Sequence, residues 1–261
     1  MSDLPTVLIT GASSGLGAIY ADRFAKRGHD LILAARDVAR LDALADRLRS
    51  ETGVAVEVIR ADLTDGADIG VLETRLREDD RIGVLLNNAG TAIGGFYGSA
   101  DGPSIESLIT LNVTAASRLA IAAAQTWSQR AAGGSIVNIS SVVAFIPDSP
   151  LGLYSATKAF VQSLSQGLNG AFGDKGVYVQ AVMPAATRTE IWERGGIHPD
   201  SIPGMMLADD LVDAALVGFD RRELVTLPSL SDADLWDAYE TARQALIPSI
   251  RNAEPAGRYR T

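Results

Sequence analysis

Tyr154 and Lys158 have the side-chain chemistry of a proton-transfer pair and stand four residues apart, in the string Tyr-Ser-Ala-Thr-Lys. On a helix, residues at this spacing lie on the same face. A free tyrosine has a pKa of about 10, and proton exchange near neutral pH requires lowering it by roughly 3 units, or about 4 kcal/mol. A nearby ammonium favours the phenolate and so lowers that pKa. The pair predicts acid–base chemistry, although the same spacing also occurs by chance on ordinary helix surfaces.

Other polar residues in the chain accompany this pair. Ser141 follows the apolar run 135–139 and precedes Tyr154 by 13 residues (154 − 141). Asn88 and Gly90 belong to the string Asn-Asn-Ala-Gly, which ends the apolar run 82–86, and Asn112 lies in the helical stretch that follows. Because these residues accompany the pair, the Tyr–Lys spacing is poorly explained by chance.

A glycine-rich turn, Thr-Gly-Ala-Ser-Ser-Gly-Leu-Gly (10–17), follows the first apolar run and opens the first helical pattern. Glycines allow a tight turn and a close approach of the backbone to a pyrophosphate, while the helix N-terminus offers unpaired N–H groups and a positive dipole end. The spacing G-x-x-x-G-x-G differs from the better-known G-x-G-x-x-G. Its position after the first strand nevertheless predicts a dinucleotide site, with these candidate residues: Gly11, Ser13, Ser14, Gly15, Leu16 and Gly17.

Arg36 follows the second apolar run, at the place where NAD-binding domains carry an acidic residue for the ribose 2′-OH. The run itself ends on Ala35, which has no carboxylate, and an arginine there can hold the 2′-phosphate of NADP. Asp37 is the competing candidate for NAD, but its position favours the N-cap of the next helix. We therefore predict NADP as the cofactor.

Short apolar runs alternate with amphipathic stretches such as Val38–Thr52 and Ile105–Arg130. Several runs are apolar on both faces, as in parallel strands covered by helices. The alternation predicts an α/β fold with a doubly wound, mostly parallel, seven-stranded sheet and helices on both faces (Rossmann-like). The predicted strands are Thr6–Thr10, Asp30–Ala34, Ala55–Arg60, Ile82–Leu86, Ser135–Ile139, Val177–Met183 and Leu224–Leu227.

No linker or repeat interrupts the pattern, so we expect one dinucleotide-binding and catalytic domain over residues 1–261. A long glycine- and proline-containing segment, 185–207, carries Trp192 and predicts a lid over the substrate. The tail 231–261 begins with a helical pattern over Ser231–Ile247 and predicts a packing or subunit-contact element.

The bulk composition excludes several classes of site. The chain has no cysteine, which excludes disulfides and thiolate metal sites, and two histidines, His29 and His198, are too few for a histidine-based metal site. The net charge of −9 argues against nucleic acid as a partner. With no signal-peptide pattern and no unbroken apolar run of about 18 residues, we expect a cytoplasmic protein without a membrane span.

The glycine turn, Asn-Asn-Ala-Gly, Asn112, Ser141 and the Tyr–Lys pair together resemble the short-chain dehydrogenase/reductase family, in its shorter, non-extended branch. The resemblance covers about residues 5–190 and implies a role for each matched residue. Tyr154 would be the general acid/base, Lys158 would bind the nicotinamide ribose and lower the tyrosine pKa, and Ser141 would hydrogen-bond the substrate oxygen. Asn112 would kink its helix and hold a water behind Lys158. Further cofactor contacts are implied for Asp62, Leu63, Asn88, Gly90, Pro184, Thr187 and Thr189.

Three positions depart from the family's common pattern. Ala185 follows Pro184 where glycine is common, Ala144 stands three residues after the serine where glycine is common, and Thr187 replaces a small apolar residue. The added methyl groups narrow the pocket or shift its loops.

The resemblance implies hydride transfer between NADP(H) and a carbonyl or secondary alcohol, with reduction favoured in the cell. The alternatives are a related imine or enoyl reduction and a non-catalytic binding or sensing protein. Apolar residues on the loops suggest a lipophilic or aromatic ketone, and each could equally be plain packing: Ile93, Phe96, Val142, Val143, Leu151 and Trp192. We favour a simple turn for Asp148, and the apolar faces of 105–130 and 153–172 permit a homodimer or homotetramer.

Overall fold

The computed structural model describes residues 4–92, 101–148, 151–190, 198 and 202–260. Its contacts divide the chain into two compact units, one ending at Pro228 and one beginning at Ser229. The first unit contains the sheet and the predicted site residues. The predicted lid residue Trp192, with Ile93 and Phe96, lies outside the described residues.

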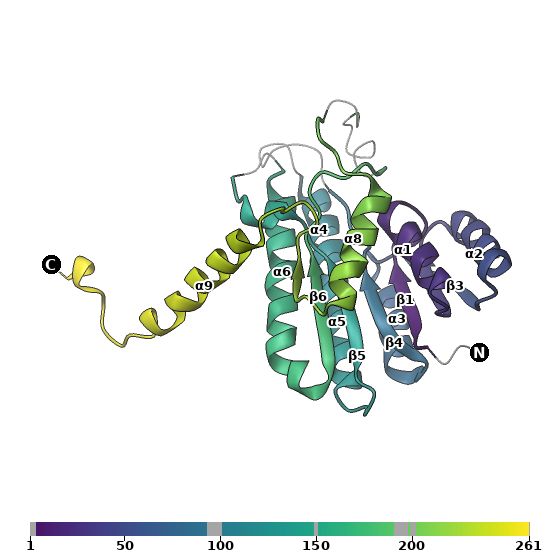
Figure 1. Cartoon of the computed structure of the whole chain (residues 1–261), viewed down its shortest axis with the longest axis horizontal. Coiled ribbons are helices and arrows are strands. Elements are labelled where there is room, and N and C mark those ends of the chain that lie inside the picture. Colours follow the sequence, from purple (N-terminus) through teal and green to yellow (C-terminus); the bar gives the residue numbers. More distant parts are fainter. Residues whose placement is uncertain (1–3, 93–100, 149–150, 191–197, 199–201, 261) are drawn as a thin grey trace. The chain divides into compact units, whose positions relative to one another are not determined.

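Seven parallel strands form one sheet in the order β3-β2-β1-β4-β5-β6-β7, which confirms the predicted fold class (Figure 1). Their short apolar runs are buried because helices cover both faces, and every residue of β1, β2 and β6 is buried. The strands are β1 Thr6–Thr10, β2 Leu31–Ala35, β3 Val56–Arg60, β4 Ile82–Asn87, β5 Gly134–Ile139, β6 Val177–Val182 and β7 Val225–Thr226.

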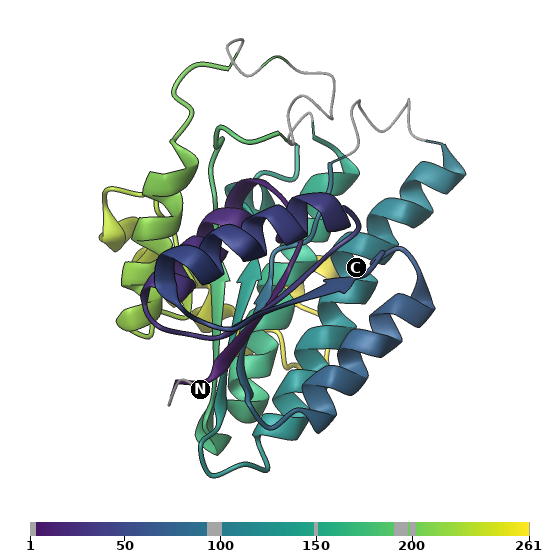
Figure 2. The same ribbon diagram turned by 90° about the vertical axis from the view of Figure 1, so that its right-hand side faces the viewer.

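Two helical layers enclose the sheet and produce two hydrophobic cores (Figures 1 and 2). One core joins the sheet to α1, α2 and α8, through residues such as Phe24, Leu41 and Leu211. The other joins it to α3, α5 and α6, through Leu72, Trp127 and Leu168. The helices are α1 Gly15–Lys26, α2 Val38–Thr52, α3 Gly66–Glu78, α4 Gly102–Ile109, α5 Ala116–Trp127, α6 Leu153–Phe172 and α8 Ala208–Asp220, with 3₁₀ turns at Val142–Phe145 and Gly173–Lys175.

The chain reverses the direction of strand addition between β1 and β4, which are neighbours in the sheet. In open α/β sheets, ligands bind in the crevice outside the carboxyl ends of the strands at such a switch point. The glycine turn follows β1 and Asn88 follows β4, so both lie at this crevice.

The predicted helical stretch 105–130 is irregular around Asn112, where the family resemblance implies a kink. Helix α4 continues into a π-helical segment, Thr110–Ala115, before α5 begins. Over Gly102–Trp127 the described chain is long and apolar enough to cross a bilayer, judged by length and composition alone. Leu119, Ala123 and Trp127 are fully buried against the sheet and its neighbours, as in the core helix of a globular domain.

The second unit consists of α9 (Ala233–Ser249) and a 3₁₀ turn at Gly257–Tyr259. Asp232 caps α9 by accepting from the N–H of Asp234 at 3.0 Å, and Trp236 stacks on Tyr239 with ring centroids 5.5 Å apart. No residue of α9 is buried. The predicted subunit-contact role of this tail stays a prediction.

Candidate active site

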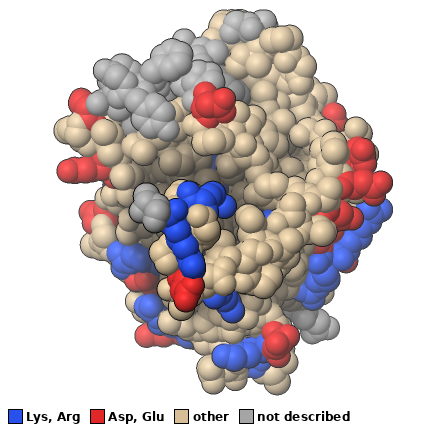
Figure 3. Space-filling view, turned by 90° about the vertical axis from the view of Figure 1, so that its left-hand side faces the viewer, with Lys and Arg blue, Asp and Glu red and all other residues tan. Residues whose placement is uncertain are grey.

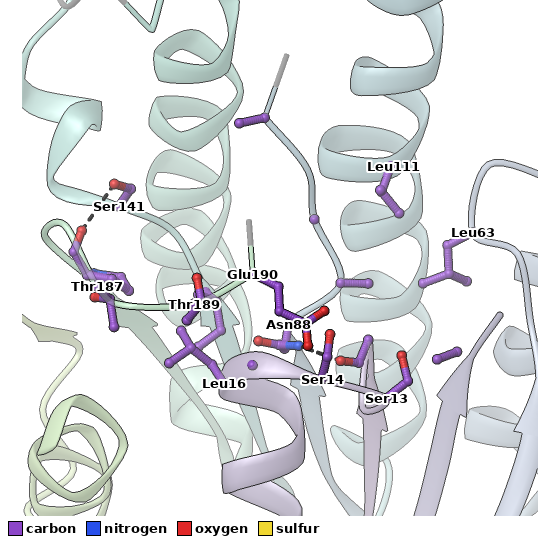
Figure 4. A pocket seen from close by; sticks show the side chains of 18 of the residues that line it. Ser13, Ser14, Leu16, Leu63, Asn88, Leu111, Ser141, Thr187, Thr189 and Glu190 are labelled. Atoms are coloured by element: carbon purple, nitrogen blue, oxygen red, sulfur yellow. Dashed lines mark hydrogen bonds between the residues drawn. The ribbon is translucent and has the colours of Figure 1, made fainter. Parts of the chain in front are cut away.

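A cavity of about 760 Å³ opens at the carboxyl ends of the strands. Figure 4 labels ten of the residues that line it, contributed by segments that are far apart in the sequence. Gly17 and Asn112 are the two predicted site residues that do not line the cavity, because both are buried behind its wall. The predicted residues that line it are Gly11, Ser13, Ser14, Gly15, Leu16, Arg36, Asp62, Leu63, Asn88, Gly90, Ser141, Tyr154, Lys158, Pro184, Thr187 and Thr189.

The glycine turn is held against the end of β4 so closely that a side chain would not fit. A Cβ on Gly17 would lie 2.4 Å from the carbonyl oxygen of Gly11 and 2.5 Å from Nδ2 of Asn88. Gly11 has a φ of +65°, in the region that favours glycine. The turn leads into α1 with Ser14 at the N-cap, whose side chain makes no capping hydrogen bond. Ser14, Gly15 and Leu16 line the cavity, so the N-terminus of α1 faces it, as an anionic pyrophosphate requires.

Asn88 holds this turn in place through its side chain. Its Nδ2 donates to the carbonyl oxygens of Thr10 and Gly11, at 3.0 and 3.1 Å. In return, Oγ1 of Thr10 accepts from the N–H groups of Asn88 and Ala89, both at 3.1 Å. The side chain of Asn88 thus fixes the shape of the cradle, in addition to lining the cavity.

Charged residues surround the far end of the cavity, after β2 and β3. Asp37 is the N-cap of α2, and its carboxylate accepts from the backbone N–H of Arg40 at 3.0 Å, which confirms the predicted capping role. Asp62 accepts from the N–H and Oγ1 of Thr64 at 3.0 and 2.7 Å. Partial burial favours the neutral form of Asp62, but those hydrogen bonds and the charge of Arg36 outweigh it and lower the pKa of this carboxyl.

Ser141 and Tyr154 form the centre of the predicted catalytic group. The Ser141 hydroxyl donates to the carbonyl oxygen of Pro184 at 3.1 Å. The side chains of Ser141 and Tyr154 are hydrogen-bonded to each other. Burial raises the pKa of Tyr154 well above its usual value, and the bond to Ser141 opposes this rise. A positive charge brought near the phenol would lower that pKa.

Lys158 supplies such a charge on the same face of α6. Its Nζ lies 5.4 Å from the centroid of the Tyr154 ring and donates to the carbonyl oxygen of Ile139 at 2.9 Å. The Ser140 hydroxyl donates to the carbonyl oxygen of Lys158 at 2.7 Å and so ties this turn of α6 to the end of β5. Burial lowers the pKa of Lys158 to about 8.

Asn112 lies within the π-helical segment, behind Gly90 and Lys158. Its Oδ1 accepts from the N–H of Thr91 at 2.9 Å, and its Nδ2 donates to the carbonyl oxygen of Thr91 at 2.9 Å and to Oγ1 of Thr157 at 3.1 Å. All the polar atoms of this buried side chain are therefore engaged. The water relay implied for Asn112 stays a prediction.

Apolar side chains line the part of the cavity next to Ser141 and Tyr154. Val142, Val143 and Leu151 all contribute to the wall and are half-buried. Ala185 lines it as well, whereas Ala144 and Asp148 do not, and Asp148 is exposed in a turn as predicted. Thr187 donates to the carbonyl oxygen of Ala185 at 2.9 Å, so its added hydroxyl is used within the loop.

Comparison with known proteins assigns this arrangement to a family. The family model for short chain dehydrogenases matches residues 5–197. The chain belongs to the short-chain dehydrogenase family.

Two solved structures match over nearly the whole chain. A short-chain dehydrogenase from Sphingobium yanoikuyae, solved in complex with NADPH, is 61% identical with a TM-score of 0.96, and the match covers 98% of this chain and 100% of that one. A bulky-bulky ketone specific alcohol dehydrogenase from Comamonas testosteroni is 53% identical with a TM-score of 0.92, and the match covers both chains completely.

A more distant curated relative is the very-long-chain 3-oxoacyl-CoA reductase of Anas platyrhynchos. It is 35% identical over 191 residues, which are 70% of this chain and 60% of that protein. This short-chain dehydrogenase therefore spans less than two thirds of the length of that relative.

Sequence reasoning about this short-chain dehydrogenase missed one ion pair at the cavity. Nη1 of Arg40 donates to both carboxylate oxygens of Glu190, at 3.0 and 2.9 Å, and both residues line the cavity. The two residues are 150 positions apart, so no spacing pattern connects them. The one signal in the sequence was a second arginine, Arg40, four residues after Arg36.

Proposed function

We propose that this chain is an NADP(H)-dependent ketone reductase and secondary alcohol dehydrogenase whose substrate is lipophilic. The observation that carries the proposal is the convergence, in one cavity, of a hydrogen-bonded Ser141–Tyr154 pair, the Lys158 ammonium and a glycine turn with no room for side chains. A nucleotide cradle beside an acid–base pair is what hydride transfer to a carbonyl requires.

The cavity fits a phosphorylated dinucleotide. The turn at residues 11–17 presents a helix N-terminus for a pyrophosphate, and Arg36 lines the cavity after β2 for a 2′-phosphate. The NADPH bound to the relative from Sphingobium yanoikuyae supports this assignment. Bound NADPH supplies the hydride, and residues of the chain transfer the proton.

Tyr154 is the proton donor in reduction. A substrate carbonyl oxygen placed between the two hydroxyls would accept from Tyr154 and, once Ser141 turns away from Pro184, from Ser141 as well. Negative charge grows on that oxygen as the carbon receives the hydride, and these donors stabilise it until the Tyr154 proton transfers. The Lys158 ammonium stabilises the resulting phenolate. Alcohol oxidation follows the reverse path, with the phenolate accepting the proton.

The substrate class follows from the wall beside this pair. Val142, Val143 and Leu151 offer apolar contacts and no charged partner for the groups on either side of the carbonyl. The relative from Comamonas testosteroni, described as specific for bulky-bulky ketones, supports ketones that carry a large apolar group on each side. Binding energy would then come from apolar burial, at roughly 25 cal/mol per Å².

A substrate panel tests the proposal. The purified chain is incubated with NADPH and with diaryl ketones, aryl alkyl ketones, keto esters, steroid ketones and small polar ketones, and loss of the reduced cofactor is followed by absorbance. The highest kcat/KM is expected with ketones that carry large apolar groups on both sides. Tyr154→Phe should show no turnover with any of these ketones. If NADPH binds but no ketone is reduced, the chain is a binding or sensing protein, and turnover only with imines or enoyl compounds would contradict the ketone assignment.

We also propose a cytoplasmic homodimer or homotetramer formed through α4, α5 and α6. Ile109, Ile121 and Phe160 on these helices are exposed by more than a third. Figure 3 shows one face of the molecule, with a cluster of charged side chains of both signs at its right-hand edge. Light scattering of the purified chain would test the assembly, and a monomeric mass at micromolar concentration would contradict it.

A further inference from the structure

We propose that Arg40 is a second cation for the 2′-phosphate of NADP(H) and that Glu190 competes with the phosphate for it. The inference rests on the proposed use of NADP(H) and identifies a specificity-determining residue beyond Arg36. Glu190 holds Arg40 in the structure. When NADP(H) binds, the guanidinium pairs with the phosphate instead.

The charges around this end of the cavity make a single arginine insufficient. Arg36 and Arg40 line it together with three carboxylates, those of Asp37, Asp62 and Glu190. A 2′-phosphate brings up to two further negative charges to this region. With Arg36 as the only cation, the phosphate would meet an excess of like charge, which costs affinity. Arg40 is the other cation that lines this end among the described residues.

The position of Arg40 allows it to reach both partners. Arg36 and Arg40 stand four residues apart, and Arg40 lies in the first turn of α2, whose N-terminus faces the adenosine side of a nucleotide bound at the switch point. Its Nε lies 3.3 Å from Oδ2 of Asp37, while Nη1 contacts Glu190. Arg40 therefore already neutralises Asp37, the carboxylate that would otherwise favour NAD.

Glu190 comes from the opposite side of the cleft, directly beside the pyrophosphate cradle. A Cβ on Gly15 would lie 3.7 Å from the Cβ of Thr189, which places the residue before Glu190 at the glycine turn. Figure 4 shows the Glu190 side chain near Ser14 and Asn88 at this turn. The Arg40–Glu190 pair thus connects α2 to the segment after β6 beside the path that a dinucleotide must occupy.

Exchange of partners is favourable because the existing pair is exposed. About half of each side chain is accessible, 51% for Arg40 and 43% for Glu190. Such exposed pairs contribute little to stability, because solvent screens the charges. A phosphate offers a guanidinium a stronger bidentate partner with more charge. Only a cofactor with the 2′-phosphate can take Arg40 from Glu190, so the exchange contributes to discrimination against NAD(H).

Direct titration of NADPH and NADH into four variants tests the exchange without relying on turnover. Arg40→Ala should weaken NADPH binding about tenfold and leave NADH within about twofold, because one charge-assisted hydrogen bond to the phosphate is lost. Glu190→Gln should tighten NADPH about two- to fivefold, because the competing exposed pair is removed. The double variant should match Arg40→Ala, since Glu190 acts through Arg40. Arg49→Ala removes the same charge from the far end of α2, where Arg49 pairs with Asp46, and should change neither affinity.

Several results would overturn the exchange. If Arg40→Ala weakened the binding of NADPH and NADH equally, Arg40 would have a structural role. If Glu190→Gln weakened NADPH binding, Glu190 would help to hold the cofactor. An improvement that persists in the double variant would indicate simple repulsion between Glu190 and the cofactor. Failure of the proposed function looks different, because wild type would then bind NADPH no better than NADH. If wild type prefers NADPH and only Arg36→Ala removes the preference, the role of Arg40 alone is wrong.

Discussion

The Nζ of Lys158 lies 5.4 Å from the centre of the Tyr154 ring while it donates to the carbonyl oxygen of Ile139 at 2.9 Å. The lysine is therefore fixed at the end of β5 and does not extend toward solvent. Its charge acts on the tyrosine through space, from a buried position where charge interactions are screened least. The same burial imposes a cost on the ammonium that can be measured as a pH dependence of stability.

We predict that the cofactor-free protein gains stability between about pH 8 and pH 10. Burial lowers the pKa of Lys158 from 10.5 to about 8, so in this window the unfolded chain binds more protons than the folded one, and stability rises by at most about 1.4 kcal/mol per pH unit. Above about pH 10 the trend reverses, because burial raises the pKa of Tyr154 and the folded state then keeps its proton longer. Urea unfolding across this pH range measures the rise in stability, which Lys158→Met should lack. An identical rise in that variant would contradict its assignment to Lys158.

Tyr154→Phe should abolish turnover and leave cofactor binding intact. The phenylalanine ring fills the same space, but the hydroxyl that exchanges the proton is gone, which should lower kcat at least about 100-fold. NADPH titration and steady-state kinetics measure the two effects separately. Lys158→Ala is the matched comparison and should lose both activity and cofactor affinity. A Tyr154→Phe variant retaining more than about a tenth of the wild-type kcat would show that another group transfers the proton.

Arg36→Ala should remove most of the preference for NADPH over NADH. One or two charge-assisted hydrogen bonds to a phosphate, each worth roughly 1.5–3 kcal/mol, predict a preference of about ten- to several-hundred-fold. Asp37 does not reverse it, because its carboxylate caps α2 and contacts Arg40. The measurement is kcat/KM with both cofactors, in wild type and variant. Equal or better use of NADH by wild type would refute the cofactor prediction, and an unchanged ratio in the variant would move the phosphate site elsewhere.

Gly17→Ala should damage both stability and cofactor binding. Its Cβ would meet the backbone oxygen of Gly11 at 2.4 Å, so the turn must open, at a cost of roughly 1–3 kcal/mol. Gly70→Ala, in the middle of α3, is the control, because the nearest atom to its Cβ would be the flexible Arg118 side chain at 3.9 Å. That change should increase stability by about 0.5–1 kcal/mol. Denaturant midpoints and NADPH titration compare the two variants. If both variants were as stable and bound NADPH as well as each other, the close contact between Gly17 and Gly11 would have no consequence.

The sheet could be predicted in detail because its strands are short apolar runs with clear ends. All seven predicted strands are present, with each end within one residue of the prediction. The helix at 38–52 was predicted at its observed bounds, since Asp37 caps it and Gly53 ends it with a φ of +75°. The interruption at Thr110–Ala115 was indicated only by the family resemblance at Asn112, because the stretch 105–130 is rich in apolar and small residues and a shift of one residue in its pattern does not stand out.

Site residues could be predicted where the type and spacing of their side chains indicate a chemical role. Ser141, Tyr154 and Lys158 do so, and the structure brings them together. The Arg40–Glu190 pair could not be predicted, because it depends on how the first turn of α2 and the segment after β6 meet. The link from Asn112 to Thr157 joins two helices across the core and is likewise invisible in local spacing.

In the π-helical segment, the number of residues matters as well as their identity. A π turn holds one residue more than an α turn. Removing one residue from Thr110–Ala115 would restore a regular helix and rotate everything after it by about 100° relative to α4. Leu119, Ala123 and Trp127 would then leave the sheet, or α4 would turn instead. Substitutions in this segment can be absorbed locally, whereas a deletion puts the two halves of the helix out of phase and Asn112 can no longer face Thr157.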